Sequence, residues 1–106
     1  MKEILETVID ASNEELIRAI KEHGLFASDH EGIAIIEEEI MEALEEINAA
    51  AKAFCNLKNS VFHDMPAEKV AEQNMKILRA ALLGSCELIQ VAAMTKKFDA
   101  ARKGEK

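Results

Sequence analysis

Three glutamates at helical spacing are the first candidates for chemistry in this sequence. Glu38, Glu39 and Glu42 stand in the acidic run IIEEEIMEALEEI. Side chains three and four residues apart are neighbours on a helix, so these carboxylates would repel one another unless a cation lay between them. Carboxylate oxygens are ligands that Mg²⁺ prefers. The spacing therefore predicts a magnesium site, and a solvated acidic helix face is the simpler alternative.

A glutamate inside an apolar segment is the second candidate. Glu87 lies in the stretch LLGSCELIQVAAM, where most neighbours are apolar, and Gln90 follows one helical turn later. An ionised carboxylate is costly to bury unless it is paired. A metal ion shared with the acidic run would account for both features, whereas a salt bridge to Arg79 or a bond to Lys96 would account for Glu87 alone.

Helices must position these side chains, because apolar residues recur at three- and four-residue spacing along the chain. The pattern predicts one helix over about residues 2–23 and a second over about 29–59. A third follows Pro66 and continues to about Phe98. No segment alternates with the period of two that is typical of strands, so we expect an all-α fold.

Residues that end and begin helices support these limits. Gly24 is typical of the position just past a helix C-terminus. Ser28 and Glu31 form an S-x-x-E capping box ahead of the second helix. Ser12 and Glu15 show the same spacing, which would allow a break in the first helix.

Composition restricts the class of protein. The chain has 106 residues, of which 49% are hydrophobic and 31% are charged, and its net charge is −7. We expect one folded domain, small enough for oligomerisation to enlarge its core. The negative charge argues against nucleic-acid binding, and an anionic ligand would need a metal ion between itself and the protein. Because we find neither an uninterrupted apolar run of bilayer length nor a signal-peptide pattern, we expect no membrane association and a cytoplasmic location.

The two cysteines, Cys55 and Cys86, lie far apart without CxxC spacing. We expect reduced thiols buried in the core.

Taken together, the two acidic segments resemble a known family. The pattern EExxE at Glu38, Glu39 and Glu42, followed by an ExxD-like pair at Glu87 and Gln90, is similar to the signature of the MazG-like all-α nucleoside triphosphate pyrophosphohydrolases. The flanking segments HEGIAIIEEEIMEAL and ELIQVAAM resemble the two conserved blocks of its small, single-domain members. The resemblance is strongest over residues 25–98, within a single domain that we expect to span 1–106.

The resemblance implies a fold and a chemistry. It implies a bundle of three to four antiparallel helices, completed by oligomerisation into a homodimer or homotetramer. It also implies Mg²⁺, with Mn²⁺ as a substitute, and hydrolysis of a nucleoside triphosphate between its α and β phosphates to the monophosphate and pyrophosphate.

The implied residue roles follow by position. Glu38, Glu39 and Glu42 would be catalytic and would bind metal together with Glu87, and one of these acids on the acidic run would hold the attacking water. Gln90 stands where the family has Asp. Its neutral amide would offer the metal only a carbonyl oxygen and one negative charge fewer.

Basic residues near the two segments are candidates for the substrate phosphates. His30 belongs to the HEG sequence, Lys76 and Arg79 precede Glu87 on the third helix, and Lys96 and Lys97 follow it. Each could instead be a solvated or paired surface residue.

Other functions remain open at this point. Because Gln90 replaces an acid, the chain could bind nucleotides with weak turnover. It could also be a non-enzymatic helical oligomerisation or adaptor module, or a regulatory partner that uses the acidic face of the second helix.

Overall fold

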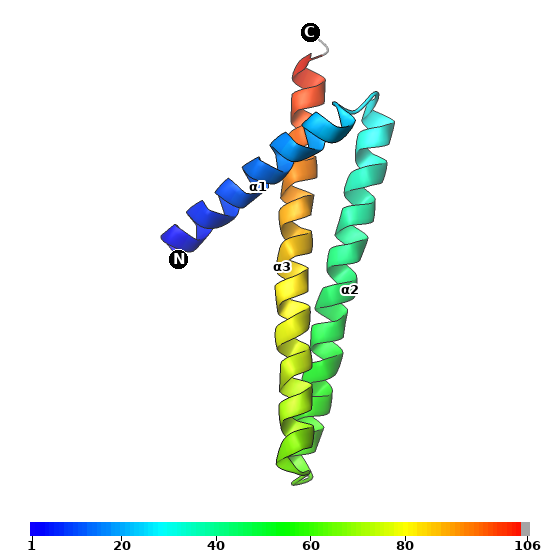
Figure 1. Cartoon of the computed structure of the whole chain (residues 1–106). Coiled ribbons are helices and arrows are strands. Elements are labelled where there is room, and N and C mark those ends of the chain that lie inside the picture. The colour runs from blue at the N-terminus through cyan, green and yellow to red at the C-terminus, as the bar shows by residue number, and fades with distance from the viewer. Residues whose placement is uncertain (105–106) are drawn as a thin grey trace. The chain divides into compact units, whose positions relative to one another are not determined.

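The computed structural model describes residues 1–104, which form three helices (Figure 1). They are α1 (Lys2–His23), α2 (Asp29–Phe62) and α3 (Ala67–Gly104). The described residues include no strand. The predicted all-α fold is therefore confirmed.

The predicted helix ends are close to the observed ones. The first helix ends at His23 and is followed by Gly24, whose φ of 71° is strained for residues with a side chain and whose N–H donates to the Ile20 carbonyl at 2.7 Å. Ahead of α2, the Glu31 N–H donates to Ser28 Oγ at 3.2 Å, as the capping box predicts. The second helix continues to Phe62, a few residues past the expected end.

The break considered near Ser12 does not occur, because α1 is continuous through it. The Ser12 hydroxyl bonds back to the Ile9 carbonyl at 2.8 Å. It also accepts a hydrogen bond from Lys96 Nζ at 2.6 Å, and this ammonium donates to Asn13 Oδ1 at 2.8 Å as well. Lys96 thus joins α3 to α1 and has partners other than Glu87.

The helices are divided between two compact units. Unit 1 comprises Met1–Met41 and the described part of Glu87–Lys106, and unit 2 comprises Glu42–Cys86. The core of unit 1 is formed by α1, the beginning of α2 and the end of α3. Its members are Ala19, Phe26, Ala93, Met94 and Ala101, with Leu16, Ile35, Ile36 and Phe98 packed around them.

One glycine is needed for the packing of unit 1. A Cβ on Gly32 would lie 3.0 Å from Phe98 Cε2 and 3.2 Å from Phe26 Cδ2, and nearer still to Phe98 Cδ2. Only glycine lets both aromatic rings approach the α2 backbone so closely. Gly32 is the glycine of the HEG sequence, so this part of the resemblance has a packing reason in the present chain.

Unit 2 is an antiparallel hairpin of α2 and α3 joined by a turn at residues 63–66. Its buried apolar residues are small: Ala43, Ala53 and Ala80. A Cβ on Gly84 would come within 3.3 Å of Glu46 Cβ, so the two helices lie close together there.

Large apolar side chains lie on the surface of unit 2. Phe54 is 55% exposed, and Leu82 is 60% exposed. Both cysteines are free and exposed, so the expectation of buried thiols was wrong. The physical reason is that two helices alone can bury only one face of each other.

The third helix is long and apolar enough to cross a membrane by length and composition alone. Charged and polar residues interrupt the apolar pattern of this helix, so its sequence contains no unbroken apolar run of bilayer length. Core helices of soluble proteins have the same properties, so this finding leaves the location of the protein open.

Candidate functional site

Two of the predicted metal ligands come together in unit 1. Glu39 on α2 and Glu87 on α3 each offer a carboxylate oxygen, and these oxygens lie within 4.8 Å of each other. Both side chains are half-buried. The structure therefore brings the acidic run to the glutamate of the apolar segment, a proximity that the sequence suggested through a shared metal ion.

The other two acids of the predicted set differ in position. Glu42 follows Glu39 by three residues on the same helix, so it shares that helix face, and it is the first residue of unit 2. Glu38 is exposed and lies outside the group of acids that could hold an ion. Helix geometry explains this difference, since adjacent residues point about 100° apart.

Gln90 is in contact with α1. The pKa of Glu15 on this helix lies below its ordinary value, mainly because Glu15 forms a bidentate ion pair with Arg18. Burial opposes this shift, and a hydrogen bond from the Gln90 side chain lowers the pKa further. Because a carboxylate accepts this bond, the Gln90 amide N–H is the donor. An aspartate at position 90 would instead place a second negative charge beside Glu15.

A pocket of about 360 Å³ lies beside Glu39 in unit 1. Residues of all three helices and of the segment between α1 and α2 form its wall. They are Arg18, Ala19, His23, Phe26, Glu31, Ile35, Glu39, Gln90, Met94 and Lys97. The pocket thus adjoins the pair of carboxylates and contains three basic side chains.

Lys97 is the unusual member of this pocket, because its side chain is buried with 5% exposure. Its ammonium lies 4.4 Å from the centre of the Phe26 ring, a cation–π contact. Lys97 was one of the basic residues that the sequence offered for contact with the substrate phosphates, and the structure places it in this pocket. Lys97 lies seven residues after Gln90, two helical turns along the same face of α3, and this spacing is the sequence feature that places both residues on one side of the helix.

The other basic residues that were predicted to contact substrate lie elsewhere. His30 is exposed in the first turn of α2 and does not line the unit 1 pocket. Lys76 and Arg79 belong to unit 2, where they line another pocket of about 370 Å³. Arg18 and His23 of α1, a helix with no diagnostic motif, were missed because only tertiary packing brings them to the site.

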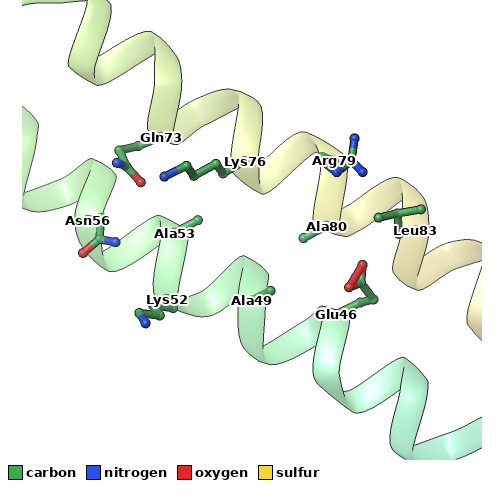
Figure 2. Close-up of a pocket in the computed structure, with 10 residues that line it drawn as sticks. All are labelled: Glu46, Ala49, Lys52, Ala53, Asn56, Gln73, Lys76, Arg79, Ala80 and Leu83. Carbon is green, nitrogen blue, oxygen red and sulfur yellow. The ribbon is translucent and has the colours of Figure 1, made fainter.

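Figure 2 shows this second pocket between α2 and α3. Lys76 lies along the space between the helices, and Glu46 extends from α2 toward Ala80. Glu46 Oε2 and Gln73 Oε1 are buried and make no hydrogen bond within the described residues. The Lys76 ammonium is 3.7 Å from a Glu72 carboxylate oxygen, an exposed pair of small energetic value.

Comparison with known proteins identifies no relative: no family model, curated protein or solved structure matches the chain. The MazG-like family therefore stays a prediction from the two acidic segments. The case for a function depends on the geometry of unit 1.

Proposed function

We propose that the protein is a Mg²⁺-dependent nucleoside triphosphate pyrophosphohydrolase of the MazG-like type, which releases the monophosphate and pyrophosphate. The observation that carries the proposal is the position of Glu39. Its carboxylate lies beside that of Glu87 and also lines the pocket that contains Lys97. A magnesium–triphosphate complex combines a divalent cation with anionic oxygens, so it requires carboxylates and basic groups side by side.

The donor set fits magnesium. Mg–O bonds are about 2.0–2.1 Å long, so two ligand oxygens on one ion are at most about 4.2 Å apart. The Glu39 and Glu87 oxygens lie within 4.8 Å, and a small side-chain rotation would therefore suffice. Glu42, one turn along α2, would supply a third carboxylate. Bound Mg²⁺ would neutralise charge on the triphosphate and lower the pKa of a coordinated water.

The chain's own residues would bind and orient the substrate. Glu39 and Glu87 extend from long helices, which hold a site more precisely than loops do. Lys97 would bind phosphate oxygens, and one carboxylate of the acidic run would accept a proton from the attacking water. A cavity of about 360 Å³ lies within the range of small-molecule sites.

We further propose that the protein is a cytoplasmic homodimer or homotetramer. The exposed apolar side chains of unit 2, such as Phe54, Leu78 and Leu82, support this proposal. Exposed apolar surface of this extent is typical of interfaces between chains. A second copy would bury it and would also account for the membrane-like composition of α3 in a soluble protein.

The test is release of pyrophosphate from a panel of ribo- and deoxyribonucleoside triphosphates, with and without Mg²⁺. We expect Mg²⁺-dependent release by the wild type and a loss of at least about 100-fold in Glu39→Gln and Glu87→Gln, since each removes a metal ligand. Glu37→Gln is the matched control, because Glu37 is an exposed acid on the same helix. No release by the wild type would refute the hydrolase.

Binding without turnover is the second candidate function, and the contact of Gln90 with Glu15, which lowers the pKa of that carboxyl, favours it. That contact involves the residue that stands where the resemblance implies aspartate. Calorimetry with a non-hydrolysable triphosphate and Mg²⁺ would detect this function when pyrophosphate release is absent.

A further inference from the structure

The groove between α2 and α3 in unit 2 contains two polar atoms that the described chain leaves without a donor. Glu46 Oε2 and Gln73 Oε1 line this groove, are buried, and accept no hydrogen bond from the described residues. A buried carboxylate oxygen is costly without a donor. A ligand that brings N–H donors would remove this cost, so the groove is a candidate binding site.

A cation lies inside the same groove. Figure 2 shows Lys76 along the space between the helices, whereas Lys52 and Arg79 extend away from this space. The Lys76 ammonium is 3.7 Å from a Glu72 carboxylate oxygen, and both side chains are exposed. An exposed ion pair of this kind is weak, so a ligand anion can replace Glu72. The groove therefore offers an anion and a cation to one ligand.

The spacing of these groups fixes the length of the ligand. Glu46 extends toward Ala80 (Figure 2), and Gln73 precedes Ala80 by seven residues on α3. At 1.5 Å per residue, Ala80 and Gln73 are about 10 Å apart along the helix, and Lys76 lies between them, about 6 Å from Ala80. An extended peptide advances about 3.3–3.6 Å per residue, so two or three residues would span this distance. A free amino acid is too short.

The floor of the groove leaves room for such a chain. It is formed by Ala49, Ala53 and Ala80, whose methyl groups are the smallest side chains that can line it. The groove has a volume of about 370 Å³, which lies within the range of small-molecule sites.

The groove lies on a different side of each helix from the exposed apolar residues of the proposed interface between copies. Phe54 precedes Asn56 of the groove by two residues, and Leu78 follows Lys76 by two. Residues two positions apart on a helix point about 160° away from each other. An assembly that buries Phe54 and Leu78 would therefore leave the groove open to a small ligand.

We infer that the groove binds a short peptide with free termini. The terminal ammonium of the peptide would donate to Glu46, its carboxylate would pair with Lys76, and a backbone N–H would donate to the Gln73 oxygen. Neither a phosphate chain nor a polyamine carries both charges. The inference does not depend on the proposed hydrolase, because no residue of this groove lines the unit 1 pocket.

The test is calorimetric binding of tri-alanine to the full chain. We expect Glu46→Gln and Lys76→Met each to weaken binding by about 10-fold or more, because each removes a hydrogen bond between charged groups. Lys76→Arg should retain most of the affinity. Glu45→Gln is the matched control, since Glu45 is the exposed acid next to Glu46. No binding of tri-alanine by the wild type at millimolar concentrations would overturn the proposal.

Peptides with one blocked terminus assign each charge to its partner. Acetylation removes the ammonium and amidation removes the carboxylate, so each should weaken binding to the wild type by about 10-fold. Acetylation should have no further effect in Glu46→Gln, and amidation none in Lys76→Met. Wild-type protein that binds blocked and free tri-alanine equally would overturn the proposal, whether or not the variants fold.

Sedimentation equilibrium distinguishes the peptide from a second copy of the chain. Tri-alanine should bind without changing the measured mass. A lower mass in its presence would mean that another copy occupies the groove, and it would overturn the proposal. Pyrophosphate release is a separate result: tri-alanine binding without release would support the groove and refute the hydrolase, and release without tri-alanine binding would do the reverse.

Discussion

Replacement of Gly32 by alanine tests the packing that supports the candidate site. Two effects oppose each other in this variant. Alanine is favoured over glycine in a helix by up to about 1 kcal/mol. The added methyl, however, would lie 3.0 Å from Phe98 Cε2 and 3.2 Å from Phe26 Cδ2, with a closer approach to Phe98 Cδ2. Ordinary carbon contacts are about 3.5–4.0 Å, so the Phe98 ring has to move.

Overpacking of this kind costs about 1–3 kcal/mol. The helix preference of alanine offsets less of this cost than it would in mid-helix, because Gly32 lies in the first turn of α2. We therefore expect Gly32→Ala to lower the free energy of unfolding by about 1–2 kcal/mol. For a chain of this size that corresponds to a Tm about 4–16 °C lower, since each kcal/mol shifts the Tm by about 4–8 °C.

Urea unfolding followed by far-ultraviolet circular dichroism, at one fixed protein concentration, is the assay. Gly104→Ala is the matched control, because the nearest contact of its Cβ would be Leu25 Cδ1 at 3.4 Å, the movable end of a side chain, and it should change stability little. Phe98→Leu combined with Gly32→Ala should recover part of the loss, since the smaller side chain frees space. A Gly32→Ala protein more stable than the wild type, with effects that add independently to those of Phe98→Leu, would refute the reasoning.

Two further predictions concern Gln90 and the surface of unit 2. We expect Gln90→Asp to lower the Tm without Mg²⁺, because a second carboxylate would face Glu15, and to increase the stabilisation that Mg²⁺ provides. Adding Glu15→Gln to this variant should restore the Tm. An unchanged Tm in Gln90→Asp would contradict the contact between Gln90 and Glu15. We expect Leu82→Glu to reduce the mass measured by sedimentation equilibrium, since Leu82 is 60% exposed in the single chain. The control variant Glu37→Gln should leave the measured mass unchanged. An unchanged mass in Leu82→Glu would mean that the interface lies elsewhere.

Gln90 shows why a sequence pattern is not a complete description of a site. On the sequence alone, Gln90 indicated a weaker metal site. In the structure its side chain lies close enough to Glu15 of α1 to lower the pKa of that carboxyl, and an acid there would face another acid. Position 90 is therefore subject to two demands, one from the acidic group and one from the first helix.

The sequence by itself determined the helices and the residues that end them. Hydrophobic spacing, Gly24 and the Ser28 capping box act within a few residues, so their effect can be read locally. Helix spacing also indicated that Glu39 and Glu42 share a face, whereas only the fold could bring Glu87 to Glu39.

Tertiary structure alone decided which basic residues reach the candidate site. Lys97 and Phe26 are 71 positions apart in the chain and meet only because α3 returns to the loop that follows α1. The exposure of Phe54 likewise follows from how few helices one chain offers to cover it. Local preferences specify the elements, but contacts between distant residues depend on how those elements pack.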